Sequence, residues 1–234
     1  MPGIYDEPEY YEAACAYRDV PAEVDALLRW SGKHYEPPRS VLELAAGPAG
    51  HARDLASAAG IPLTVIQADM RDFSLPGPFD LAVTMLNSLC HLLTLDDMLR
   101  HLAAVGRHLE RDGLYIMELA HPADYFSAER RTSSEWTSET RDGTVSVRWG
   151  AQDQIDPVSQ ITREHVSVTY HKRGGPVRTV TDIVPNRFWT ATELTAAIRC
   201  DGGFSVAASY GDFDGDVPVD AADAWRMILV LRRE

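Results

Sequence analysis

The chain has 234 residues, of which 45% are hydrophobic, and its 22 basic and 35 acidic side chains leave a formal net charge of -13. This length suits one domain with room for an insertion. The acidic excess argues against nucleic acid as a main partner, because a duplex-binding surface is normally basic. The three cysteines lack metal-ligand spacing, which favours a reducing compartment without disulfides. No apolar run approaches the ~20 residues of a membrane helix, and the N-terminus lacks a signal-peptide core. We therefore expect a soluble, cytoplasmic protein with no membrane partner.

The first half of the chain alternates predicted helices and strands. Helices are predicted at residues 7–16, from 21 onward, at 51–59 and from 95 onward. Strands are predicted at residues 41–44, 63–66, 79–85 and 114–119. In the second helix, Val24, Leu27 and Leu28 form one apolar face. Thr94 to Asp97 is an N-cap pattern that begins the fourth helix. Alternating strands and helices indicate a parallel sheet with right-handed crossovers.

The second half has a different pattern. Residues 131–187 contain β-rich runs at 144–149, 161–170 and 177–184. The turn signals Asp142-Gly143 and Gly174-Gly175 separate them, so we expect an antiparallel insertion built of hairpins. A capping box from Thr190 to Glu193 then begins a helix, and two strands follow at 204–210 and 225–231. The sequence therefore predicts an α/β fold: N-terminal helices, a mostly parallel sheet and an antiparallel β insertion.

One segment indicates where a ligand would bind. The strand at 41–44 contains an acid, Glu43, and runs into a turn of small residues from Ala45 to Gly50 before the next predicted helix. Such a turn lets the backbone approach a ligand closely, and a helix N-terminus offers free N–H groups. The pattern is typical of a nucleotide or nucleoside site. A plain tight connection between a strand and a helix is the alternative.

Four segments in the same order resemble class I S-adenosylmethionine (SAM)-dependent methyltransferases. They are residues 43–49, 69–73, 79–88 and 109–117. The ending, from Gly203 to the final strand, is also similar, so the resemblance covers nearly the whole chain. It implies a Rossmann-like fold and transfer of a methyl group from SAM to a small-molecule acceptor. Residues 1–130 and 188–234 would then form the SAM-binding domain. The insertion at 131–187 would serve as a substrate cover or the surface of a homodimer, and it is equally able to be purely structural.

The resemblance also implies roles in cofactor binding. Glu43 would lie beside the cofactor, and Met85 would line the site of its methionyl part. Asp69 would accept a hydrogen bond from the adenine amino group, although a turn or N-cap aspartate is the alternative. The remaining assignments are Ala45, Gly47 and Ala49 for backbone access, Met70 for covering the adenine ring, and Arg18 for the SAM carboxylate. An exposed surface arginine is the alternative for Arg18.

On the acceptor side, His91 is the candidate general base, because its ordinary pKa suits proton removal near neutrality. A histidine that only packs at a helix start is the alternative. The other candidate substrate-binding residues are Tyr5, Tyr11, Asn87 and His121. Simple packing is the alternative for both tyrosines. The eight histidines show no HExxH motif or close His/Cys cluster, so we predict no metal.

Two features depart from the family pattern. Ala49 replaces the second glycine of the first motif. Between Gly50 and Asp69 there is room for only one helix and one strand, whereas the family has a further strand and helix of roughly 20 residues. The missing strand normally ends in the acid that binds the SAM ribose. Three explanations are open for the missing strand and helix: the sequence omits them, they have been deleted, or they have been lost naturally. The alternative function is therefore a methyltransferase-like protein with reduced or lost SAM binding, acting as a scaffold or catalysing another reaction.

Overall fold

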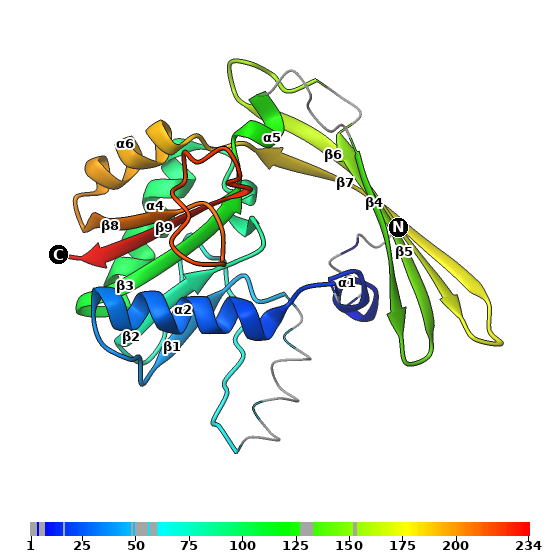
Figure 1. Cartoon of the computed structure of the whole chain (residues 1–234), viewed down its shortest axis with the longest axis horizontal. Coiled ribbons are helices and arrows are strands. Elements are labelled where there is room, and N and C mark those ends of the chain that lie inside the picture. Colours follow the sequence, from blue (N-terminus) through cyan, green and yellow to red (C-terminus); the bar gives the residue numbers. More distant parts are fainter. Residues whose placement is uncertain are drawn as a thin grey trace. The chain divides into compact units, whose positions relative to one another are not determined.

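The computed structural model describes residues 4, 8–15, 17–47, 49, 56, 60–126, 133–151 and 154–234. The chain forms two compact units whose elements are labelled in Figure 1. The first contains Met1–Arg18, Ala46–Gln67 and Arg131–Asn186. The second contains Asp19–Ala45, Ala68–Arg130 and Arg187–Glu234. Tyr5 and all but residue 56 of the helix predicted at 51–59 lie outside the described residues.

The second unit is built on a five-stranded sheet with the order β1-β2-β3-β9-β8. Its strands are β1 (Val41–Leu44), β2 (Phe79–Thr84), β3 (Leu109–Ala120), β8 (Phe204–Tyr210) and β9 (Arg226–Arg233). The pairs β1–β2 and β2–β3 are parallel, whereas β9 is antiparallel to both β3 and β8. Four of the five strands therefore run in one direction, and the predicted mostly parallel sheet is confirmed.

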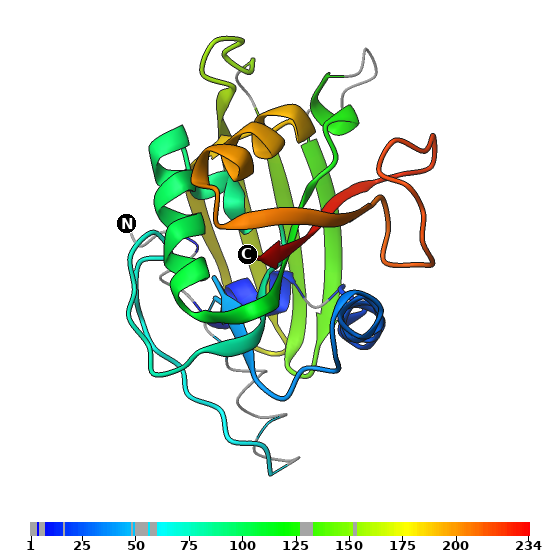
Figure 2. The ribbon, with the colours of Figure 1, turned by 90° about the vertical axis from the view of Figure 1, so that its left-hand side faces the viewer.

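Helices cover both faces of this sheet. Figure 2 shows α4 (Leu95–Arg107) and α6 (Ala191–Asp201) on one side and α2 (Val20–His34), seen end-on, on the other. Side chains alternate along β3, so Tyr115 packs in the cluster with α4 and α6, while Ile116 packs in the cluster with α2. The sheet thus separates two apolar layers of the same unit. No helix among the described residues is long and apolar enough to cross a membrane.

The predicted N-cap at Thr94 and the predicted capping box at Thr190 are both confirmed, and both helix starts are capping boxes. In α4 the side chain of Thr94 accepts a hydrogen bond from the Asp97 amide at 3.0 Å, and the Asp97 carboxylate accepts from the Thr94 amide. Thr190 and Glu193 make the same reciprocal pair at the start of α6. Each box satisfies backbone donors that a helix end leaves free, which explains why both helices begin where the sequence indicates.

The predicted apolar face of α2 is wrong for Val24 and Leu28, whereas Leu27 packs against the core. Val24 and Leu28 are 44% and 48% exposed, whereas Ala26 and Trp30 are fully buried. The Trp30 ring stacks on Tyr210 of β8, with centroids 4.6 Å apart and an interplanar angle of 8°. The largest side chain of the helix therefore lies on the buried face, because an indole buries more apolar area than either a valine or a leucine side chain.

The buried strand predicted at 63–66 is also wrong. This segment forms no strand, and Leu63, Val65 and Ile66 are 47%, 38% and 53% exposed. An extended apolar run is stable as a strand only when a neighbouring strand satisfies its backbone and one face is covered. β1 lies at an end of its sheet and pairs with β2 alone among the described strands. The strand–helix unit expected between β1 and this segment is absent from the described residues.

The first unit contains a four-stranded antiparallel sheet with sequential order, as the turn signals predict. Its strands are β4 (Ser133–Thr140), β5 (Gly143–Ala151), β6 (Ile161–Lys172) and β7 (Val177–Arg187). The helix α1 (Pro8–Ala14) packs on this sheet, where Tyr10 and Ala14 join a buried cluster with Val147 and Val166. The Trp136 indole donates a hydrogen bond to the Ala14 carbonyl at 2.9 Å. This unit therefore includes N-terminal residues as well as the predicted insertion.

Candidate functional site

Strained backbone gathers at the carboxyl ends of adjacent parallel strands. Leu44 of β1 is in register with Thr84 of β2. Shortly beyond these positions, Ala45, Leu86 and Asn87 have φ angles of 54°, 56° and 55°. A left-handed conformation costs roughly 1–2 kcal/mol for a residue with a Cβ and is retained mainly where the surrounding structure imposes it. Ligands of open α/β sheets bind at the carboxyl ends of strands, so this edge is the candidate site.

A buried carboxylate supports the turn after β2. Glu118 of β3 is 2% exposed, and its Oε2 accepts a hydrogen bond from the Asn87 amide at 3.3 Å. Asn87 Oδ1 in turn accepts from the Ala120 amide at 3.1 Å. Arg226 of β9 forms an ion pair with Glu118 Oε1 at 3.2 Å, although the two groups are not aligned for a hydrogen bond. Burial raises the pKa of Glu118, and the Arg226 charge opposes that shift.

His91 lies at the end of the short helix η2 (Ser88–His91), directly after this turn. The hydroxyl of Ser88 donates to the Met85 carbonyl at 2.7 Å, which closes the turn, and the Met85 side chain is buried. Burial lowers the pKa of His91 below its ordinary value of 6.5. The imidazole is therefore neutral at pH 7 and can accept a proton, as a general base must.

Asp69 is bound by an arginine that the sequence analysis did not identify. Its carboxylate accepts from Arg71 Nη2 at 2.6 Å, from Arg71 Nε and from the Arg71 amide. These hydrogen bonds lower the pKa of Asp69 to about 2, so it is ionised. Arg71 Nη1 also donates to Asp97 at 2.8 Å. The Asp72 amide donates to the Asp69 carbonyl at 3.0 Å, so Asp69 also begins a turn. Its side chain remains 47% exposed, and the adenine role stays a prediction.

Other candidates of the second unit have different surroundings. Glu43 is exposed on β1. His121 uses both ring nitrogens: Nδ1 accepts from the Ala123 amide at 3.2 Å, so Nε2 carries the hydrogen and donates to the Val219 carbonyl at 2.8 Å. This histidine connects the start of α5 (Ala123–Phe126) to the acidic loop between β8 and β9. Its role in substrate binding stays a prediction.

Met70 of the second unit is partly buried against the core of that unit, whereas the other remaining cofactor candidates belong to the first unit. Gly47 has φ +61°, and a Cβ added to it would lie 3.1 Å from Tyr11 Cε1. Ala49 is buried and also left-handed, with φ 54°. Arg18 is half-buried, and its amide donates to the Cys15 carbonyl at 3.2 Å. The left-handed backbone at Gly47 therefore favours glycine, and a Cβ there would require a small shift of the Tyr11 ring.

The described residues also define what this edge of the sheet lacks. No group of three or more His, Cys, Asp or Glu side chains among them is placed to hold a metal ion. No described strand lies between β1 and β2 in the chain, so the strand expected to end in the ribose-binding acid is not found there.

Comparison with solved structures gives matches that cover nearly all of the chain. A SAM-dependent methyltransferase from Clostridium acetobutylicum matches with a TM-score of 0.75 and 13% identity over 96% of both chains. A sugar N-methyltransferase from Streptoalloteichus matches with a TM-score of 0.71 and 20% identity, over 100% of this chain and 94% of its own. A SAM-bound amino pentose methyltransferase from Micromonospora echinaspora matches with a TM-score of 0.66 and 19% identity over 96% of both.

These similarities define the class of fold. The chain has the fold of class I SAM-dependent methyltransferases, as the four sequence segments predict. No protein-family model and no curated protein matches the sequence.

Proposed function

We propose that the protein is a SAM-dependent methyltransferase that methylates an amino group of a small, sugar-like acceptor. The observation that carries this proposal is the strained backbone of Ala45, Leu86 and Asn87 at the adjacent carboxyl ends of β1 and β2. Among the similar structures, one is named a sugar N-methyltransferase, one an amino pentose methyltransferase and one a glycopeptide N-methyltransferase. Two of these names specify nitrogen as the methylated atom, which supports an amino group as the acceptor.

Methyl transfer needs an aligned nucleophile and a dry site more than it needs several acids and bases. SAM supplies an electrophilic methyl group on a positively charged sulfur. With SAM bound, an acceptor nitrogen held in line with the carbon–sulfur bond would receive the methyl group, and the electron pair of that bond would remain on sulfur. His91, neutral at pH 7, accepts the proton that the nitrogen loses. Asn87 would orient the acceptor beside His91.

Binding roles follow the resemblance. In the second unit, Met85 and Met70 would contact the methionyl and adenine parts of SAM, and Asp69 the adenine amino group. Glu43 and the backbone of Ala45 would lie beside the cofactor. In the first unit, the backbones of Gly47 and Ala49 would allow close approach, and Arg18 would bind the carboxylate. Tyr11 and His121 remain proposed acceptor contacts.

A second candidate function is a methyltransferase-like protein that has lost methyl transfer. The observation that favours it is the passage from β1 to β2 without a further strand among the described residues, since that strand is expected to end in the ribose-binding carboxylate. Loss of such a hydrogen-bonded group costs about 1–3 kcal/mol of binding. The residual affinity for SAM therefore distinguishes the two functions.

Titration calorimetry with SAM and with its demethylated product tests the proposal. We expect the intact chain to bind both, and no heat of binding at millimolar ligand would exclude the methyltransferase function. Asp69→Ala should weaken binding about tenfold, the effect of one lost charged hydrogen bond. Asp72→Ala is the matched control, because the Asp72 side chain is 73% exposed and its ion pair with Arg107 is 3.6 Å long. Equal effects would show that the adenine-binding segment has been misassigned.

A further inference from the structure

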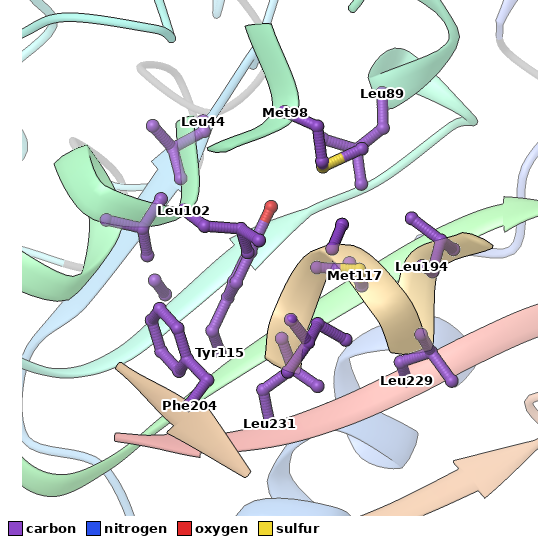
Figure 3. Close-up of a cluster of buried hydrophobic side chains, with 14 of the residues drawn as sticks. Leu44, Leu89, Met98, Leu102, Tyr115, Met117, Leu194, Phe204, Leu229 and Leu231 are labelled. Atoms are coloured by element: carbon purple, nitrogen blue, oxygen red, sulfur yellow. The ribbon is translucent and has the colours of Figure 1, made fainter. Parts of the chain in front are cut away.

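A chain of hydrogen bonds links the Asp69–Asp72 turn to the core of the second unit. His101 on α4 is completely buried, and its Nδ1 lies 2.8 Å from the Met70 carbonyl oxygen. Its Nε2 lies 2.7 Å from the Tyr115 hydroxyl on β3. That hydroxyl lies 2.8 Å from Thr84 Oγ1 on β2. Figure 3 shows the Tyr115 oxygen among aliphatic side chains that include Leu102, so the chain of hydrogen bonds crosses an apolar core.

The chemistry of the groups determines which atom donates in each of these three hydrogen bonds. A carbonyl oxygen only accepts, so His101 Nδ1 carries a hydrogen and donates to Met70. Burial lowers the pKa of His101 to about 4, so the ring is neutral and Nε2 is an acceptor. Tyr115 therefore donates to His101, and the Tyr115 oxygen accepts from the Thr84 hydroxyl. Each buried polar group thus has a partner, which fixes the orientation of the imidazole.

α4 holds the turn at two points on one helix face. Asp97 binds Arg71, which in turn binds Asp69, while His101 binds the Met70 carbonyl. Asp97 and His101 are four residues apart in the helix and so lie on the same face, one turn from each other. The first contact involves partly exposed charged groups, whereas the second is buried. Buried hydrogen bonds restrict motion more than exposed ion pairs do, because water does not compete for them.

We propose that His101 is a positioning residue for cofactor binding, which holds the Met70 carbonyl and so keeps the Asp69–Met70 segment in its binding geometry. The inference rests on the proposed function, in which this segment contacts the adenine. His101 itself touches no substrate in this scheme. Its contribution is to reduce the number of conformations that the segment must lose when the cofactor binds.

Two substitutions at one position test the direction of the hydrogen bonds. In His101→Asn the side-chain amide takes the place of Nδ1 and still donates to Met70. In His101→Gln the amide reaches the place of Nε2, keeps Tyr115 as a partner and leaves the Met70 carbonyl without its donor. We expect His101→Gln to weaken SAM binding about tenfold by calorimetry, and His101→Asn to stay within about twofold of the wild type.

Thr84→Val is the matched structural control. It removes the far end of the chain of hydrogen bonds without touching Met70, so it should lower stability and leave SAM affinity within about twofold. Hydrogen exchange of the Asp72 amide, which donates to the Asp69 carbonyl at 3.0 Å, supplies a readout that needs no cofactor. This amide should exchange faster in His101→Gln than in Thr84→Val.

The outcomes separate this inference from the proposed function. If the wild type binds no SAM, both are overturned. If the wild type binds SAM and His101→Gln binds it equally well, only the inference is overturned. Should His101→Gln fail to fold, Tyr115→Phe replaces it, because this change removes the hydrogen bond that orients the ring. We then expect about threefold weaker SAM binding, and an unchanged affinity contradicts the positioning role.

Discussion

The carboxylate of Glu118 accepts a hydrogen bond from the backbone amide of Asn87, with Oε2 and N 3.3 Å apart. Asn87 is in the left-handed conformation, and Glu118 lies on the neighbouring strand β3. A side chain of one strand therefore stabilises the strained turn that ends the adjacent strand. His91, the candidate base, follows this turn by a few residues, so its position depends on the same contact.

Removing this carboxylate should destabilise the protein. We expect Glu118→Ala to lower the free energy of unfolding by about 3 kcal/mol, because it leaves the partly buried Arg226 charge without its carboxylate partner. Urea denaturation measures the loss. Glu118→Gln is the control, since its amide oxygen still accepts from Asn87, and it should cost about half as much. Equal losses in the two variants would mean that the acceptor for Asn87 contributes nothing.

The buried His101 predicts how stability depends on pH. Its pKa is lowered from 6.5 to about 4, so below pH 6.5 the unfolded chain binds a proton that the folded protein excludes. Stability from this group is therefore complete above pH 6.5 and is lost as the pH falls towards 4. We expect about 2 kcal/mol less stability at pH 5 than at pH 7. His101→Asn should lose that dependence while keeping the contributions of the other groups; identical slopes would contradict the assignment.

Gly47 and Gly60 share a left-handed backbone, so alanine at each position distinguishes the cost of backbone strain from that of a steric contact. Gly60→Ala should cost about 1 kcal/mol, because φ is +66° and a Cβ would meet nothing within 4 Å. Gly47→Ala has the same strain, and its Cβ would also lie 3.1 Å from Tyr11 Cε1. We expect it to cost about 1 kcal/mol more and to weaken SAM binding, whereas Gly60→Ala leaves binding unchanged. Thermal denaturation and calorimetry measure the two effects, and equal behaviour would remove Gly47 from the site.

Loss of the candidate base should affect turnover and leave cofactor affinity largely intact. We expect His91→Ala to lower kcat at least tenfold, in keeping with the usual contribution of general-base catalysis, with SAM affinity within a few fold. Burial lowers the pKa of His91 below 6.5. Wild-type activity should therefore rise as the pH increases through this lowered pKa and level off above it, where the imidazole is neutral. His171→Ala, at an exposed histidine, is the control. Unchanged turnover in His91→Ala would exclude His91 from the mechanism.

The parts of the fold that depend on local chemistry follow from the sequence. Thr94 and Thr190 begin helices because each cap bonds to a residue three positions away. The antiparallel sheet likewise follows from turn residues at the hairpins. The burial of α2 could not be predicted in this way, because stacking of Trp30 on Tyr210 involves residues far apart in the chain. The apolar segment at 63–66 is exposed for the same reason: burial requires a neighbour that the sequence pattern does not specify.

In the candidate site, too, the sequence identifies residues that belong to local motifs and misses those whose roles depend on tertiary contacts. Motif order places Asp69, Met85 and His91 in the second unit, at segments that follow or flank its strands. Arg71 and Glu118 could not be identified, because their roles depend on partners that the fold brings near. Arg71 had one local signal, its position two residues after Asp69, where its amide and side chain both reach the carboxylate.

The position of β9 has a consequence for the order of folding. Among the described strands, β8 pairs with β9 alone. Arg226 of β9 pairs with Ala120 of β3, and the four insertion strands lie between these two residues in the sequence. Closing so long a loop is entropically costly before the contacts form, whereas the hairpins β4–β7 join neighbours in sequence. In pulse-labelled refolding, the amides of β5 and β6 should gain protection before those of β3 and β9. The carboxyl-end edge that carries the candidate site would then acquire its rigidity last.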